Sequence, residues 1–360
     1  MRGGQYNGFI SKNIAPKGVK QIGVYNSSGK RIGGFGVGHL AMPDLGNKLY
    51  SFGALSDIHV ADYYETSHED FQNALTYFKD NTDVSFVCIC GDLTRQGAPS
   101  ELTVYKNIVD TYYPNGTVYA MPGNHESHKA YAESSYGANY FERYTGNPWY
   151  YSITHGNDVF IFVGCHSWGE GVFSEEEIQW LYTTLENNRN KRCFVFQHVF
   201  IKGDSGNALN LYTDVYTSGS DMMADSGDLG QAFISLMQHY KNVVFFHGHS
   251  HLRFALQELD EKANYNEDMG FRSVHIPSLA VPRDYSNGVV EYVKPESEGY
   301  VVDVYENAIV LNGIDFGRYD ISTSTRDPIK LLPIATYCLD TTVQTVETKS
   351  FADIIGTNNT

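Results

Sequence analysis

Short apolar runs alternate with longer segments whose apolar residues recur at helical spacing, and this alternation continues from residue 49 to about residue 248. The run LYSFGALS at 49–56 predicts a buried strand, and the segment 65–81 predicts a helix with its apolar residues on one face. A strand at 84–91, a helix at 100–113 and a strand at 117–123 follow. Alternation of this kind predicts an α/β layered fold whose functional residues lie in loops beyond the carboxyl ends of the strands.

Further strands and helices continue this alternation and lead into a β-rich region. We expect strands near 149–154 and 158–164, a helix from Ser174, a strand at 192–198, a helix at 228–242 and a strand at 242–248. Capping boxes are expected at two helix starts, from Thr66 to Glu69 and from Ser174 to Glu177. The polar segment 201–227 has no clear period and is expected to be a functional or mobile loop. Strands are also expected at 272–281 and in a hairpin at 299–316.

The two ends of the chain differ in composition from the alternating region. Residues 1–48 are rich in Gly, Asn and Ser, and their pattern predicts a short hairpin around Ser27, Ser28 and Gly29. The last segment, 323–360, shows no helical period. We therefore predict an N-terminal extension at 1–48, one folded domain at 49–322 and a C-terminal tail at 323–360.

Composition narrows the class of protein and the partners. A chain of 360 residues with 42% hydrophobic and 14% aromatic residues can bury a large core, which excludes a disordered class. The formal net charge of -16 argues against nucleic acid and anionic membranes as general partners, because a polyanion would approach against the summed field. A small phosphate ester remains a compatible substrate, because it can enter a site that carries metal cations.

Cysteine usage and the start of the chain bear on location. Five cysteines, an odd number without paired zinc-type spacing, predict buried thiols, and four of them sit in apolar strand-like runs. The opening MRGGQYNGFISKN has no continuous apolar stretch behind its positive charge, and nowhere do about eighteen apolar residues run together. We therefore expect a cytoplasmic protein without a signal peptide or a transmembrane segment.

The residues that end the predicted strands are carboxylates, carboxamides and imidazoles. They lie in the stretches LSDIH, CGDLTRQG, PGNHES, QH and HGHSH. These stretches supply Asp57, His59, Asp92, Asn124, His125, His198, His249 and His251. Because the carboxyl ends of the strands meet at one edge, these side chains are expected to converge there.

Such oxygen and nitrogen donors without thiolate suit divalent manganese, iron, zinc, cobalt or nickel, of which we favour manganese. Seven ligands are too many for one tetrahedral zinc, but they suit two ions that share a bridging carboxylate. An Asp is the natural bridge, since each of its oxygens can face a different cation. The sequence therefore predicts a site for two divalent metal ions.

The order of these motifs, D-x-H, G-D, G-N-H-E, H and G-H-x-H, resembles that of the calcineurin-like metallophosphoesterases over roughly residues 49–315. The resemblance implies an α/β fold, a four-layer α-β-β-α sandwich of two mixed sheets flanked by helices. It also implies hydrolysis of a phosphate ester at a dinuclear centre, with a metal-bridging hydroxide as the nucleophile.

The same resemblance implies a role for each residue of the set. The first ion would be held by Asp57, His59 and His251, and the second by Asn124, His198 and His249. Asp92 would bridge the two ions. His125 would lie beside the metals as the general acid for the leaving oxygen, and Glu126 would orient an imidazole.

The second motif bears on the kind of ester. Protein phosphatases of this superfamily carry Asp-Arg-Gly at its end, but here Arg95 stands one residue early and the preceding Asp is missing. The GDLT block is more similar to phosphodiesterase branches, and the Tyr ligand of purple acid phosphatases is also absent. We therefore predict a phosphodiesterase more than a phosphomonoesterase, with Arg95 as a substrate-binding residue.

Several other residues and one other function remain open. His247 is expected to be a packed strand residue, and His128 and His166 are the other histidines closest to the predicted site. Aromatic residues in nearby loops could line a pocket: Tyr63, Tyr64, Trp168, Tyr212 and Tyr216. The alternative function is a non-catalytic scaffold or a phage-type structural protein that keeps the fold, in which case the protein would be virion-associated.

Overall fold

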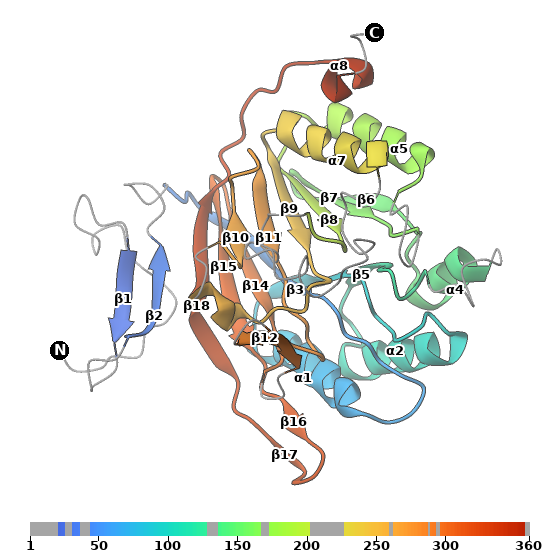
Figure 1. Cartoon of the computed structure of the whole chain (residues 1–360), viewed down its shortest axis with the longest axis vertical. Helices are drawn as coiled ribbons and strands as arrows, with labels where there is room; N and C mark the ends of the chain where they lie inside the picture. Colours follow the sequence, from blue (N-terminus) through green and yellow to red (C-terminus); the bar gives the residue numbers. More distant parts are fainter. Residues whose placement is uncertain are drawn as a thin grey trace.

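The fold is built around two six-stranded mixed sheets (Figure 1). The computed structural model of the chain describes residues 21–25, 31–36, 44–127, 136–166, 173–201, 227–258, 262–286, 289–292 and 296–356. Sheet I has the order β18 (Lys330–Asp340), β15 (Ala308–Asp315), β14 (Glu298–Tyr305), β3 (Lys48–Leu55), β4 (Val84–Cys90) and β5 (Val118–Met121). Sheet II has the order β10 (Tyr265–Asn266), β11 (Arg272–His275), β9 (Val243–His247), β8 (Cys193–Gln197), β7 (Asp158–Val163) and β6 (Tyr151–His155).

Helices cover the outer face of each sheet (Figure 1). On sheet I lie α1 (Thr66–Asn81), α2 (Pro99–Tyr112) and α4 (Tyr136–Thr145). On sheet II lie α5 (Glu175–Asn187) and α7 (Gly227–His239), with the short α8 (Phe351–Ile355) packed beside them. The smaller elements are β1 (Gln21–Tyr25), β2 (Arg31–Gly36), η2 (Phe254–Glu258), β12 (Arg283–Ser286), β13 (Val289–Tyr292), β16 (Tyr319–Asp320) and β17 (Thr325–Arg326). The predicted α-β-β-α sandwich of two mixed sheets is confirmed.

Three apolar layers hold the sandwich together, one between the sheets and one beneath each set of helices. In β8, Phe194 and Phe196 face the layer between the sheets, whereas Val195 faces α5 and α7. Rings meet across the middle layer, as where Phe52 of β3 lies edge-on to Phe160 of β7 with centroids 5.2 Å apart. Because both faces of these strands are buried, their sequences are continuous apolar runs without alternation.

The loops that follow the central strands lie at the same edge of each sheet, because these strands are parallel. In sheet I, β3, β4 and β5 run parallel, and in sheet II, β7, β8, β9 and β11 run parallel. The loops at their carboxyl ends are joined across the two sheets. His198 Nδ1–H donates to the carbonyl of Cys90 at 2.7 Å, and the backbones of Ser56 and Ser278 pair in an isolated parallel β-bridge. The loops that follow the parallel strands of both sheets therefore lie at one common edge of the sandwich.

A buried ion pair ties segments together at the start of β7 and β8. The guanidinium of Arg192 donates to both carboxylate oxygens of Asp158, at 3.1 and 2.7 Å. It also donates to the carbonyl of Tyr305 at 2.8 Å and to the hydroxyl of Thr341 at 2.9 Å. Tyr50 adds a donor to the same carboxylate at 2.7 Å. One cation thus links both sheets to the segment that follows β18.

The helix starts agree in part with the sequence. Ser174 caps α5, accepting from the backbone N–H of Glu177 at 3.1 Å, as predicted. The capping box predicted from Thr66 to Glu69 is wrong, because Glu65 occupies the N-cap position of α1 and makes no side-chain cap bond. Helix α4 was not predicted, and the predicted strand at 272–281 ends at His275.

The sequence predicts domain boundaries at residues 48 and 322, and this division into domains stays a prediction. The secondary structure at the two ends of the chain can be compared with it. The strands expected on either side of Ser27, Ser28 and Gly29 pair antiparallel as β1 and β2. Strand β18 lies within the predicted tail, yet it pairs with β15 along the edge of sheet I. Residues 330–340 are therefore part of the sandwich, although they show no helical period. The expected loop at 201–227 falls almost wholly outside the described residues.

All five cysteines are free, and four of them, Cys88, Cys90, Cys165 and Cys193, are buried, as the sequence predicts. Within the described part of the chain, none of the helices has both the length and the apolar character needed to cross a bilayer.

Replacing Arg192 by Ala is expected to destabilise the fold by about 3–5 kcal/mol, because it leaves the Asp158 carboxylate buried without its partner. Urea unfolding followed by circular dichroism measures the change. Lys106→Ala is the matched control: Lys106 pairs with Asp110 at 2.6 Å, but the two side chains are 47% and 58% exposed. The control should change stability by at most about 1 kcal/mol, and equal effects of the two substitutions would contradict the assigned role of the buried pair.

Candidate metal centre

The first two predicted ligand loops continue the pairing of their strands beyond the sheet. After β3 and β4, the backbone N–H of Ile58 donates to the carbonyl of Asp92 at 2.8 Å, and that of Val60 donates to Leu93 at 3.0 Å. In the opposite direction, the backbone N–H of Arg95 donates to the carbonyl of Val60 at 3.1 Å. The two loops are thereby held against each other, which fixes the side chains that leave them.

The ligand positions have an unusual backbone. Among the described residues, six that are not Gly have a positive φ, and five of these are predicted ligands. They are Asp57, His59, Asp92, His249 and His251, with φ between 51° and 67°. The left-handed conformation costs a residue with a Cβ roughly 1–2 kcal/mol, so it persists only where the surroundings impose it. This strain turns each side chain toward the common edge.

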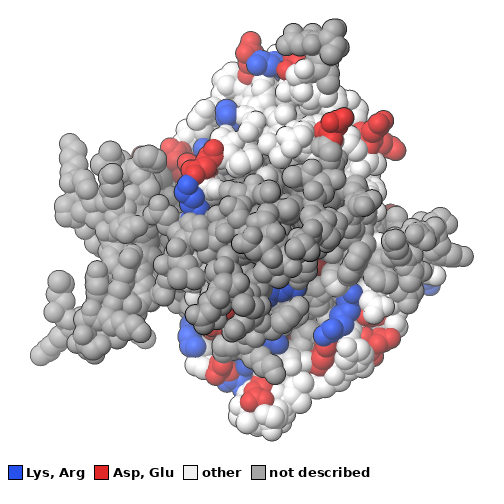
Figure 2. Space-filling model, in the orientation of Figure 1, with Lys and Arg blue, Asp and Glu red and all other residues white. Residues whose placement is uncertain are grey.

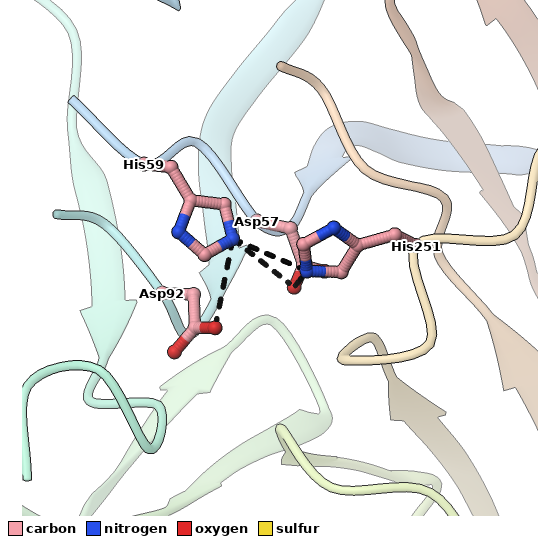
Figure 3. A group of neighbouring side chains, drawn as sticks. All are labelled: Asp57, His59, Asp92 and His251. Carbon is pink, nitrogen blue, oxygen red and sulfur yellow. Dashed lines mark hydrogen bonds and ion pairs between the residues drawn. The ribbon is translucent and has the colours of Figure 1, made fainter. Parts of the chain in front are cut away.

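Four of the predicted ligands converge in a buried group drawn in Figure 3, where their side chains point toward one another. The Nε2 of His251 lies 2.9 Å from Asp57 Oδ1 and 3.2 Å from His59 Nε2. His59 Nε2 also lies 3.7 Å from Asp92 Oδ2. One candidate ligand atom from each of the four lies within 4.8 Å of the others.

A second group shares Asp92 with the first. The second group consists of Asp92, His198 and His249, again with ligand atoms within 4.8 Å of one another. His198 Nε2 lies 3.1 Å from Asp92 Oδ2. The structure therefore brings together the residues expected around each ion, with Asp92 common to both groups.

The atoms around the carboxamide of Asn124 indicate whether the second group suits a cation. This carboxamide lies 3.2 Å from both Asp92 oxygens, 3.3 Å from His198 Nε2 and 3.2 Å from His249 Nδ1. Without a cation, the amide N–H groups would be favoured at this point. A metal ion among these acceptors would favour the oxygen, so the donor set fits a metal of the kind that accepts mixed oxygen and nitrogen ligands.

Hydrogen bonds on the far side of the ligands orient them. His198 and His251 donate Nδ1–H to the carbonyls of Cys90 and Val281, at 2.7 and 3.0 Å, which leaves each Nε2 facing the site. Asp57 accepts from the backbone N–H of His249 at 3.1 Å. Asp92 accepts from that of His125 at 3.0 Å. Each carboxylate thus keeps its second oxygen for the centre.

The charges at the site favour the metal-binding forms of His249, His251 and Asp57, but not that of His198. Burial lowers the pKa of His249 to about 3 and that of His251 to about 4, so both imidazoles are neutral at pH 7. Burial opposes charge on Asp57, but His251 and His198 outweigh it and hold the pKa of this carboxyl well below its usual range. Burial also opposes charge on His198, but Asp92 and Asp57 raise its pKa to about 9. A metal ion would have to displace that proton.

His125 lies at the rim of the centre. Its ring meets that of His59 edge-on, with centroids 4.5 Å apart, and its Nε2 lies 3.7 Å from Asp92 Oδ2. Its Nδ1 contacts the carbonyl of Arg95, which can only accept, so Nδ1 carries a proton and Nε2 faces the site. The side chain is 25% exposed, so it can reach both the cluster and an entering ligand.

Arg95 lies beside His125, but its guanidinium is paired. Its Nε and Nη2 donate to the two carboxylate oxygens of Glu65, at 2.9 and 2.7 Å. Glu65 was not anticipated as a partner, because the two residues come from different loops. Arg95 also lies 5.9 Å above the ring of Tyr63.

Glu126 has a different partner from the imidazole expected for it. Its Oε1 accepts from the backbone N–H of Thr94 at 2.9 Å and from the Thr94 hydroxyl at 2.8 Å, and its Oε2 accepts from Gly123 N–H at 2.9 Å. Glu126 therefore joins the loop after β4 to the loop after β5. Gly123 packs so closely on Asp92 that a Cβ there would collide with the carboxylate.

Among the described residues, His247 and His166 belong to neither of the two ligand groups. His247 is fully buried in β9 beside His275 of β11, as expected for a packed strand residue. His166 pairs with the buried Glu177, with Nε2 and Oε2 2.9 Å apart. His128, Trp168, Tyr212 and Tyr216 lie outside the described residues.

Comparison with known proteins identifies the family to which the chain is similar. The family model for calcineurin-like phosphoesterases matches residues 50–253. No curated protein sequence matches the chain. Its structure is similar to a purple acid phosphatase from yellow lupin (Lupinus luteus) seeds, with a TM-score of 0.54 and 14% identity over 87% of this chain. The chain covers 58% of the length of that protein, and at this identity the likeness concerns the fold alone.

Weaker likenesses are found to two other structures. One is a conserved uncharacterized protein from Streptococcus pneumoniae, described as a predicted phosphoesterase, with a TM-score of 0.37 and 9% identity over 81% of this chain and 97% of that one. The other is Vacuolar Protein Sorting 29 from Cryptosporidium parvum, with a TM-score of 0.35 and 11% identity over 82% of this chain and 100% of that one.

The layered fold and the buried Asp and His groups are those expected of the metal-dependent phosphoesterase class. Within that class, the chain belongs to the calcineurin-like phosphoesterase family, whose model matches more than half of it. The resemblance stated from the motif order is confirmed.

Replacing Asp92 by Ala is expected to abolish binding of both metal ions, because Asp92 is the residue common to the two groups. Elemental analysis by mass spectrometry after dialysis against manganese measures the metal content per chain. Asp62→Ala is the control, since Asp62 is an exposed carboxylate that accepts from Ser100 at 2.9 Å, and it should leave the metal content unchanged. An Asp92→Ala protein that kept its full metal content would contradict the bridging position.

Proposed function

We propose that the protein hydrolyses small phosphodiesters at a centre of two divalent cations, with manganese as the favoured metal. In this proposal Asp57, His59 and His251 hold one ion, Asn124, His198 and His249 hold the other, and Asp92 bridges them. The observation that carries the proposal is the convergence of two ligand groups on the single carboxylate of Asp92.

Two cations held by these residues would lower the pKa of bound water, which would supply a hydroxide nucleophile, and would neutralise charge on the phosphoryl oxygens. The chain's own residues orient the reacting groups and protonate the leaving oxygen. Asp92 stays ionised, because His198 and His125 offset its burial and keep the pKa of this carboxyl far below its usual range.

His125 serves as the general acid in this proposal. The carbonyl of Arg95 accepts from its Nδ1–H and so directs Nε2 toward the centre, where it can give a proton to the leaving oxygen. Its Nε2 lies 3.7 Å from Asp92 Oδ2 and it belongs to neither ligand group, which supports a role as acid and not as ligand.

A diester suits the charges better than a monoester. A monoester carries close to two negative charges at neutral pH, and a phosphodiester carries one. The guanidinium of Arg95, the residue beside His125, is already paired with Glu65, so it offers little extra charge to a dianion. Figure 2 shows acidic and basic side chains interspersed on the described part of the surface that it draws.

The test compares bis-p-nitrophenyl phosphate with p-nitrophenyl phosphate in the presence of manganese. The expected result is turnover of both, with the larger kcat/KM for the diester. A protein that holds two metal ions and hydrolyses neither compound would refute a phosphoesterase centre, and a clear preference for the monoester would refute the diesterase assignment.

Replacing His125 by Ala is expected to lower kcat by about 10²–10⁴-fold while leaving the metal content unchanged. The loss should be large for an alkyl leaving group and smaller for p-nitrophenolate, which departs without needing a proton. Elemental analysis and steady-state kinetics on the two kinds of ester check this. Loss of metal together with activity, or equal losses for both leaving groups, would contradict a role as acid.

A further inference from the structure

We propose that Tyr63 and Arg95 form a stacking surface for a planar aromatic leaving group, so that the preferred substrates are small phosphodiesters of a nucleoside or an aryl alcohol. The proposal rests on the phosphodiesterase function proposed above and adds the class of ester. It depends on how the loop after β3 and the loop after β4 meet beside His125.

Tyr63 is an exposed aromatic residue close to the ligands in sequence. It lies four residues after His59, in the segment that leads from the centre into α1, and it is 59% exposed. The guanidinium of Arg95 lies over its ring, 5.9 Å from the centroid. A ring supported by a guanidinium is suited to stacking with a base or another aromatic group.

Arg95 connects this ring to His125. Its carbonyl contacts Nδ1 of His125, the proposed acid, while its guanidinium holds Glu65 and faces Tyr63. A group whose oxygen is protonated by His125 must leave on the side of the phosphorus where His125 lies. The backbone and the side chain of one residue therefore connect the acid to the aromatic ring.

The charge of Arg95 is offset, which favours stacking over phosphate binding. Both oxygens of Glu65 accept from the guanidinium, and Ser67 donates to the same carboxylate at 2.9 Å. The pair keeps the guanidinium in one orientation, and the backbone bond from Arg95 to Val60 fixes the loop that carries it. A rigid surface of this kind loses little entropy when a flat ligand binds.

The neighbouring Tyr64 provides a matched control. It is 58% exposed, almost as exposed as Tyr63, but its hydroxyl donates to Glu69 of α1 at 3.0 Å. Its ring lies edge-on to His68, with centroids 5.8 Å apart. Tyr64 is therefore engaged with α1 and not with Arg95, although it has the same chemistry as Tyr63.

The experiment measures binding and not turnover. The probes are the phosphinate analogues of the methyl phosphodiesters of adenosine (at the 5′ position) and of ribose (at position 5), in which carbon replaces both ester oxygens so that each carries one negative charge and neither is hydrolysed. Isothermal titration calorimetry on the manganese-loaded full chain gives the Kd of each. The proteins are the unmodified chain, Tyr63→Ala, Tyr63→Phe and Tyr64→Ala.

The expected result is that the unmodified chain binds the adenosine probe about 5- to 150-fold more tightly than the ribose probe, the range that corresponds to stacking of one base. Tyr63→Ala should remove this difference by weakening only the adenosine probe. Tyr63→Phe should keep the difference, because it retains the ring, and Tyr64→Ala should also keep it.

Equal binding of the two probes by the unmodified chain, or equal effects of Tyr63→Ala and Tyr64→Ala, would overturn the proposal. Failure here is distinct from failure of the proposed function. If the unmodified chain hydrolyses diesters but does not discriminate between the probes, only the stacking surface is wrong. If it discriminates through Tyr63 but hydrolyses no ester, only the proposed reaction is wrong.

Discussion

The rest of the structure depends on two carboxylates that are buried close together. Asp57 and Asp92 are 0% and 1% exposed, and both reach toward His59 and His198. Burying two anions side by side is costly unless cations and hydrogen bonds offset the charge. The backbone N–H groups of His249 and His125 stabilise one oxygen of each carboxylate, and the imidazoles surround the other. Divalent cations between these groups would turn a costly arrangement into a stable one.

That arrangement also explains the backbone at the common edge. Five ligands adopt a left-handed conformation, and the loops that hold them are paired with each other and across the two sheets. Glu126 fastens the loop after β5 to the loop after β4 through Thr94 and Gly123. The strain at each ligand is thus balanced by hydrogen bonds and packing outside the ligand set, which is how a scaffold keeps a site in place before any ligand arrives.

The sequence predicts most of the central strands, and the predicted ligand residues lie close together in the structure, because both predictions depend on local signals. Apolar runs that end in Asp, Asn or His are visible without tertiary information, and the motif order is specific. The pairing of Arg95 with Glu65 and the contacts of Glu126 could not be predicted, since both join separate loops. Helix α4 has Gly, Asn, Thr and three Tyr in ten residues, which are weak helix formers. Strand β18 is mostly half-exposed, so its apolar signal is weak, although Ala335 and Leu339 are buried.

The late position of β18 has a consequence for synthesis on the ribosome. Strand β15 pairs with β14 on one side, and its other side is completed only by Lys330–Asp340. While the chain is being made, the centre and both sheets can begin to form before this segment emerges, with β15 as an open strand edge. Open edges recruit other chains, so the nascent protein passes through a stage at which self-association competes with completion of its own sheet.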